Sequence, residues 1–172
     1  MRGIAVVVVV GLLAVGCGKK AKPADPRDSA WFTVGIGSVY ESKTVTQLKS
    51  PFEHATETTM RQTLVSRTDK EASIKLEIIE GTGTTVQDLK VPRRQDEVAP
   101  HDGSKVTTAD ETCTGPAGTF ECTRTTVEVQ QDEIVRSTVT WRAKGIPVPV
   151  KVVVSNENMT MTTELTKMTV AR

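Results

Sequence analysis

The sequence predicts an all-β protein, an antiparallel meander of about eight or nine strands that forms a curved sheet, a half-barrel or a barrel. From residue 31 onward Thr and Val are frequent, and apolar and polar residues alternate with the period of a strand. Clusters of Gly, Pro, Asn and Asp separate the alternating segments. No segment has an apolar repeat of 3.6 residues that is long enough to indicate a helix.

A short apolar segment precedes this domain. A basic start at Met1-Arg2-Gly3 is followed by the apolar run 4–15 and by Gly16-Cys17. The run has twelve residues, fewer than the roughly 17 to 25 that cross a bilayer. The pattern therefore favours a secretory signal peptide over residues 1–16 rather than a transmembrane anchor. The remaining alternative is an ordinary cleaved peptide in which the cysteine has no role.

The stretch 12–17, LLAVGC, resembles the lipobox of bacterial lipoproteins. The resemblance implies that signal peptidase II cleaves between Gly16 and Cys17. Cys17 would then carry a diacylglycerol thioether and an amide-linked acyl chain such as palmitate. Gly18 follows the cysteine in place of the Asp that retains lipoproteins in the inner membrane, which implies the outer membrane. We therefore expect the chain in the cell envelope, anchored on the periplasmic side or on the surface.

Residues 17–30 are expected to form a lipidated flexible tether, and residues 31–172 a single β-domain. The tether sequence GKKAKPADPRDSA is rich in Lys and Pro and lacks apolar periodicity. Its lysines are either solvated or close to anionic headgroups. Without residues 1–16 the chain has 21 basic and 21 acidic side chains, so its charge does not point to a nucleic-acid partner.

Cys113 and Cys122 are the other two cysteines. In an exported chain two such thiols normally pair, so we predict a Cys113–Cys122 disulfide. The intervening TGPAGTFE contains turn-forming residues, which indicates that the bridge closes a β-hairpin. No His or further Cys stands at ligand spacing, so the pair does not predict a zinc site.

The first half of the domain is expected to form strands joined by loops and turns. Phe32, Val34 and Ile36 would share one face of a first strand, and the chain would continue or bend over 37–40. A loop is expected near 49–51 and another over 92–102. The strands expected between them are 54–65 with Met60 and Leu64 on one face, a strand with Ile74, Leu76 and Ile78 on one face, and 84–91.

The second half is expected to form consecutive hairpins. Ile146-Pro147-Val148-Pro149 places two prolines where ladder amides would be needed, which favours a strand edge or a bend. The strands expected on either side of it are 105–113, 119–130, 134–142, 150–154 and 159–170, the last two joined around Asn156-Glu157-Asn158.

The stretches 119–122 and 146–152, with Trp141 between them, resemble the C-terminal part of small Gram-negative envelope lipoproteins that carry one β-meander domain. The strand order is also loosely similar to the half-barrel of the lipoprotein-carrier and lipoprotein-receptor family. That family holds acyl chains in a concave face, which it covers with helices. The resemblance implies a hydrophobic ligand, and the side chains expected to line its face are Val34, Ile36, Met60, Leu64, Leu76 and Ile78.

No group of residues predicts catalysis. The two histidines, His54 and His101, have no nucleophile and orienting acid at a spacing that indicates a hydrolase. Adjacent acids in strands face opposite ways and those in turns are solvated, so the acidic pairs do not predict a metal or acid–base site. Arg93-Arg94 would suit a phosphate or lipopolysaccharide, but Asp96 and Glu97 flank this isolated basic pair. Gly81-Thr82-Gly83-Thr84 lacks the Lys and the following helix of a phosphate-binding loop, which indicates a turn. The acidic pairs are Asp96-Glu97, Asp110-Glu111 and Asp132-Glu133.

The sequence therefore predicts a non-enzymatic, outer-membrane-anchored lipoprotein without a cofactor or metal, whose β-domain binds a protein or another envelope component. One alternative is a carrier or sensor of a lipid or other hydrophobic ligand. A further alternative, a hydrolase, would require His54 or His101 inside a cleft.

Overall fold

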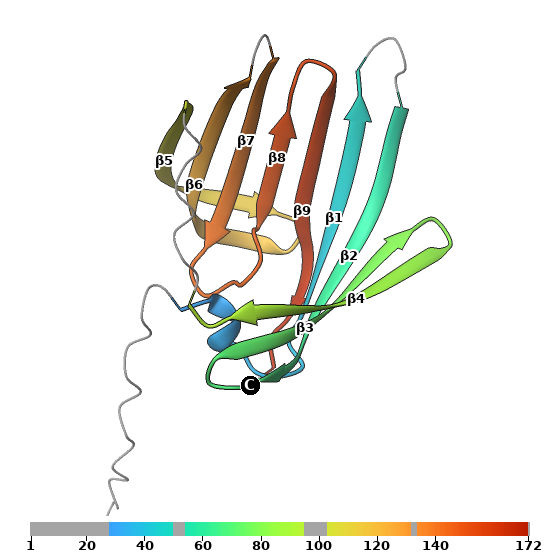
Figure 1. Ribbon diagram of the computed structural model, residues 1–172, viewed down its shortest axis with the longest axis vertical. Coiled ribbons are helices and arrows are strands. Elements are labelled where there is room, and N and C mark those ends of the chain that lie inside the picture. Colours follow the sequence, from blue (N-terminus) through green and yellow to red (C-terminus); the bar gives the residue numbers. More distant parts are fainter. Residues whose placement is uncertain (1–27, 50–53, 95–102, 132–133, 172) are drawn as a thin grey trace, which may run out of the picture.

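The chain folds into one antiparallel sheet of nine strands (Figure 1). The computed structural model describes residues 28–49, 54–94, 103–131 and 134–171. The sheet order is β4-β3-β2-β1-β9-β8-β7-β6-β5. Strands that are consecutive in sequence therefore pair with each other, except β4 and β5, and β1 pairs with β9. The strands are β1 (Val39–Leu48), β2 (His54–Arg67), β3 (Glu71–Glu80), β4 (Gly83–Pro92), β5 (Ser104–Gly115), β6 (Gly118–Gln131), β7 (Ile134–Ala143), β8 (Lys151–Ser155) and β9 (Met159–Thr169).

The meander and its strand number confirm the sequence-based prediction, whereas a barrel is excluded. β4 and β5 are the two edges and do not pair with each other, so the sheet is not closed. The sheet is nevertheless strongly twisted: in Figure 1 β4 crosses in front of the lower ends of β1 and β9. On the other side β5 contacts β9, although three strands separate them in the sheet.

The predicted first strand through Phe32, Val34 and Ile36 is wrong. Ala30–Phe32 form a 3₁₀ helix, η1, and the first strand begins only at Val39. The reason lies in the two glycines that follow. Gly37 has a φ of 90°, which a strand residue does not adopt, and a Cβ at Gly35 would collide with the backbone of Ala171. Within the described residues, no helix is long and apolar enough to cross a membrane.

The main core lies at one end of the sheet, beside η1. Trp31 packs edge-on against Tyr40, with ring centroids 5.4 Å apart. Asp28, Ser29 and Ala30, which the sequence assigned to the tether, already belong to this body, since the Ser29 amide donates to the Arg93 carbonyl at 2.7 Å. The buried side chains of this core are Trp31, Val34, Tyr40, Leu64, Ala72, Ile74, Val148 and Leu165.

The predicted bend at 146–149 explains how both halves of the sheet reach this core. Residues 144–150 leave the sheet between β7 and β8, and Val148 of this loop is buried beside Trp31. Ile146 contacts both the main core and a second cluster formed by Cys122, Ala143 and Val150. Ala117, in the turn between β5 and β6, also packs against the main core.

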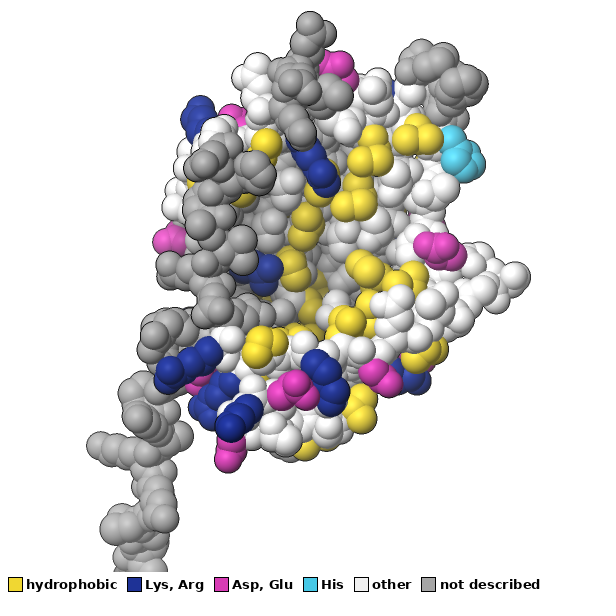
Figure 2. All heavy atoms as spheres, in the orientation of Figure 1, with side chains coloured by type: hydrophobic (Ala, Val, Ile, Leu, Met, Phe, Trp, Pro, Cys, Tyr) yellow, Lys and Arg dark blue, Asp and Glu magenta, His cyan; other side chains and the backbone are white. Residues whose placement is uncertain are grey.

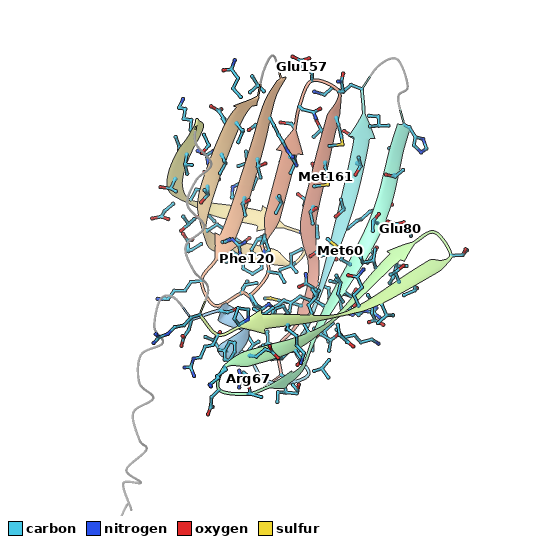
Figure 3. All side chains as sticks on the ribbon, in the orientation of Figure 1. Met60, Arg67, Glu80, Phe120, Glu157 and Met161 are labelled. Atoms are coloured by element: carbon cyan, nitrogen blue, oxygen red, sulfur yellow. A yellow bond between two sulfur atoms is a disulfide. The ribbon has the colours of Figure 1, made fainter. Side chains whose placement is uncertain are left out.

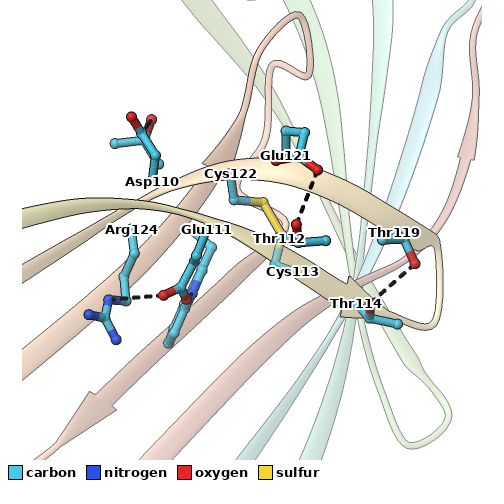
Figure 4. Close-up of a disulfide and its surroundings, with 11 residues drawn as sticks. Asp110, Glu111, Thr112, Cys113, Thr114, Thr119, Glu121, Cys122 and Arg124 are labelled. Atoms are coloured by element: carbon cyan, nitrogen blue, oxygen red, sulfur yellow. Dashed lines mark hydrogen bonds and ion pairs between the residues drawn. A yellow bond between two sulfur atoms is a disulfide. The ribbon is translucent and has the colours of Figure 1, made fainter.

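The Cys113–Cys122 disulfide crosses the β5–β6 hairpin as predicted (Figure 4). The two Cα atoms are 6.1 Å apart, inside the limit of about 7 Å for a bridge. The two residues lie diagonally, since Cys113 is opposite Phe120 and Cys122 is opposite Glu111. Cys122 is buried in the second cluster. The bridge therefore fixes the hairpin whose turn supplies Ala117 to the main core.

Replacing both Cys113 and Cys122 by Ala should lower the free energy of unfolding by about 2 to 3 kcal/mol, because the unfolded chain regains loop entropy. Urea unfolding of the double variant and of the native chain measures the difference. The double variant Thr114→Ala/Thr119→Ala is a suitable control, because it removes only an exposed hydrogen bond of 3.1 Å in the same hairpin. Equal losses in the two double variants would contradict a stabilising role of the bridge.

Candidate functional site

The two faces of the sheet differ in chemistry. Side chains alternate along each strand, and the pairing register places alternate residues of neighbouring strands on the same face. We call one of them the charged face. The ion pairs that join described strand residues all lie on it, and Arg61 contacts both Glu41 and Glu77. The other pairs are Lys43–Glu57, Lys75–Glu77, Lys90–Glu71, Lys105–Glu128, Arg124–Glu111 and Lys151–Glu164.

The opposite side is the apolar face. At the centre of the sheet, the strand pairing places Met60 opposite Ser42 and Ile78 on this face. It likewise places Met161 opposite Thr46 and Val154. The main core covers its lower part, next to η1. The side chains above that core are half-buried or exposed, apart from the buried Val154. We define the upper apolar face by Leu48, Met60, Leu76, Ile78, Val152, Val154, Met159 and Met161.

Two hydroxyl groups in the middle of this face form a hydrogen bond with each other. Thr44 of β1 and Thr163 of β9 are opposite each other, and their hydroxyl oxygens are 2.8 Å apart. This hydrogen bond leaves the strip between β1 and β9 neutral and requires no ionic partner. The strip runs from the Ser42–Leu165 pair to the Leu48–Met159 pair, about 20 Å at the rise of a strand.

Charged side chains lie at the margins of the upper apolar face. Figure 2 shows hydrophobic side chains running along the middle of this face, with most charged groups around them. Met60 and Met161 lie near its centre in Figure 3, and Glu80 lies toward the side. The register places Arg136 and Arg142 of β7 on the same face. An amphiphile with an apolar body and a polar end would match this distribution.

The structure brings together four of the six side chains expected to line a ligand face. Met60, Leu64, Leu76 and Ile78 share the apolar face, with Leu64 in the core beneath its upper part. Val34 is instead buried in that core, and Ile36 is 56% exposed beyond the end of the sheet. Sequence reasoning missed Val152, Val154, Met159 and Met161, although their alternation was visible. It did not reveal that β9 pairs with β1, which places them beside Met60.

The candidate catalytic residues that the structure describes do not assemble. His54 is exposed at the start of β2, and His101 lies outside the described residues. Asp110 and Glu111 occupy opposite faces: Asp110 accepts from Thr123, while Glu111 accepts from the Trp141 indole at 2.6 Å. The other two acidic pairs lie outside the described part of the chain. No group of three or more metal-ligating side chains occurs among the described residues.

A separate open pocket of about 350 Å³ lies at the η1 end of the domain. It is lined by Asp69, Lys70, Pro92, Arg93 and Arg94. Arg93 forms an ion pair with Asp28 at 2.9 Å and lies 5.6 Å from the centre of the Phe32 ring. Three of the five lining residues, Lys70, Arg93 and Arg94, are basic, and the pocket is distinct from the upper apolar face.

Tyr40 lies where the core meets the upper apolar face. Its ring is 1% exposed, and within the described structure its hydroxyl has no hydrogen-bond partner. Burial raises the pKa of this hydroxyl above its ordinary value of 10.0. In the unfolded chain Tyr40 ionises near pH 10, whereas in the fold it ionises at higher pH. Its contribution to stability is therefore fully present below pH 10 and is lost as the pH rises through the raised pKa.

Tyr40→Phe should raise the free energy of unfolding at neutral pH by about 1 kcal/mol, because it removes a buried hydroxyl without a partner. Above pH 10 the native chain should lose stability relative to the variant, since only the native chain has a phenol to ionise. Tyr40 is the only tyrosine of the chain, so its phenolate absorbance can be titrated without interference. A pKa at or below 10 would contradict the buried position.

Comparison with models of known protein families finds no match, and comparison with curated protein sequences finds no relative. The feature that distinguishes this domain is a sheet with ion pairs on one face and a neutral apolar strip on the other.

Proposed function

We propose that the protein is a non-enzymatic lipoprotein of the cell envelope, anchored through acyl chains on Cys17, whose β-domain binds a hydrophobic ligand on its upper apolar face. The ligand class we favour is an amphiphile with an acyl chain. The observation that carries the proposal is the neutral strip between β1 and β9, beside which Met60 of β2 and Met161 of β9 lie above the core without a described element covering them.

The dimensions and chemistry of the strip support an acyl chain. One leaflet of a bilayer holds its chains in about 15 Å, half of the hydrocarbon thickness, and the strip is about 20 Å long. Methionine side chains adapt their shape, so Met60, Met159 and Met161 suit a flexible ligand. Arg136 and Arg142 on the same face favour an anionic headgroup over a cationic one. The sheet would then have the shape of a half-barrel whose concave face contacts the acyl chain of the ligand.

The sequence also predicts a protein partner for the β-domain. A measurement of fatty-acid binding distinguishes a lipid ligand from a protein partner. A protein would also cover apolar surface, but the centre of a protein–protein interface is normally enriched in aromatic anchors. The upper apolar face consists of Leu, Ile, Val and Met residues and has no aromatic member. Lipid chemistry therefore explains its composition with fewer assumptions.

Met161→Glu should weaken the binding of a fluorescent fatty-acid analogue by about tenfold or more, because it places a charge against an apolar ligand. The matched control is Thr162→Glu, which introduces the same charge on the next residue of β9, on the charged face. Fluorescence titration, with palmitate as competitor, measures both affinities. Equal affinities of the two variants, or no saturable binding by the native chain, would refute the lipid site and leave a protein partner as the better reading.

Mass spectrometry of the native protein extracted from membranes should find residue 17 as the first residue, with acyl chains on its thiol and amine. Cys17→Ser should move the protein from the membrane to the soluble fraction. An unmodified thiol at Cys17 in membrane-extracted protein would refute the anchor. This outcome is independent of the ligand test, because the upper apolar face lies in the β-domain.

A further inference from the structure

We infer that the η1 end of the domain is a membrane-facing surface that contacts phosphate-bearing lipid headgroups. We call this surface the basal surface. It consists of the basic side chains Arg67, Lys70, Arg93 and Arg94, the ring of Phe32, and the exposed apolar side chains Ile36, Val65 and Val170. The inference rests on the proposed anchor for its orientation, but it concerns a different surface from the ligand face.

The basic half of this surface is built around Phe32. The guanidinium carbons of Arg67 and Arg93 lie 6.0 and 5.6 Å from the centre of its ring. Arg67 donates to the carbonyl oxygens of Trp31 and Val34, so η1 fixes its position. Lys70 and Arg94 complete the open pocket beside it, which also contains Asp69. Within the described part of the chain, the basic side chains of this half thus lie near the carboxylates of Asp28 and Asp69.

Two backbone hydrogen bonds place the apolar half of this surface. Gly37 donates its amide to the Leu64 carbonyl, which holds the Ile36 turn beside Val65. Gly35 donates to the Ala171 carbonyl, which places Val170 next to the same turn. Ile36, Val65 and Val170 are 56%, 51% and 49% exposed. Exposed apolar groups that gather beside basic groups are typical of surfaces that lie in the interfacial region of a bilayer.

The path of the chain gives this surface its orientation. Asp28, the first described residue, is held at the η1 end by its ion pair with Arg93. Cys17 is eleven residues before it, so a fully extended connection spans at most about 40 Å. Figures 1 and 3 show η1, Arg67 and the C-terminal end of the chain at this end, with Glu157 of the β8–β9 turn at the opposite end. Acyl chains on Cys17 would therefore hold the basal surface next to the headgroups.

Hydrogen exchange of the acylated native chain in vesicles of phosphatidylcholine with phosphatidylglycerol, compared with detergent, tests the orientation. Peptides that cover 30–38, 64–70 and 166–171 should become protected, because the lipid covers them. Peptides that cover 84–90 and 104–110, on the two edge strands, should not change. Protection of the edge strands without protection of the η1 end would overturn the inference.

The unacylated chain 17–172 with Cys17→Ser tests the surface without the anchor. Lys70→Glu/Val170→Asp should reduce its partition onto the same vesicles by about tenfold or more, because each basic residue adds attraction to an anionic surface. The matched control is Lys105→Glu/Val86→Asp, which makes the same chemical changes at exposed positions of the edge strands. Circular dichroism verifies that both variants fold.

Equal partition of the two double variants, or equal binding to vesicles of phosphatidylcholine alone, would overturn the inference. Inorganic phosphate that abolished binding at millimolar concentration would show a site for the free ion and would likewise overturn a membrane-facing role. If Cys17 carried no acyl chain but the unacylated chain still bound the vesicles as expected, only the anchor would be refuted. Intact acylation without these effects would refute the basal surface only.

Discussion

The contact between Trp31 and Tyr40 is the interaction on which the rest of this structure depends. A single open sheet has no second layer, so it must bury part of one face by its own twist and by its connections. Here η1 places Trp31 edge-on against Tyr40, and Ile74 of β3, Leu165 of β9 and Val148 of the β7–β8 loop close around the pair. Both halves of the meander are thereby fixed to one end, and no described element covers the opposite end of the same face.

The segregation of charge follows from this arrangement. A strand offers its two faces alternately, and a face that packs against no other layer must be compatible with water. The charged face solves this with cross-strand ion pairs such as Lys151–Glu164, whose atoms are 2.8 Å apart. Exposed pairs of this kind add little stability, so their main effect is solubility and strand register. Thr44 and Thr163 instead pair with each other, which keeps the apolar face free of charge in its middle.

The sequence was sufficient for the local architecture because strand alternation and turn residues are local signals. Met60 and Leu64, or Ile74 and Ile78, can be assigned to one face from spacing alone, and the diagonal Cys113–Cys122 bridge follows from two thiols around a turn. The prediction was wrong for residues 30–36 because Phe32, Val34 and Ile36 alternate like the residues of a strand. Gly35 instead lies close to the backbone of Ala171, and Gly37 has a positive φ. The β1–β9 pairing joins residues more than one hundred positions apart, and no local signal specifies it.

That pairing is also what creates the candidate site. β9 brings Met159 and Met161 beside β1, and β8 adds Val154 on the other side, so the apolar strip contains residues from both ends of the chain. The strip and the basal surface both adjoin the main core. The strip extends from the core along the sheet, whereas the basal surface faces away from the sheet at the η1 end. A domain held to a bilayer by its η1 end would thus present the open end of its apolar strip toward the aqueous side. A hydrophobic ligand would then reach the strip from outside the membrane, which suits capture or presentation of an amphiphile better than its extraction from the anchoring leaflet.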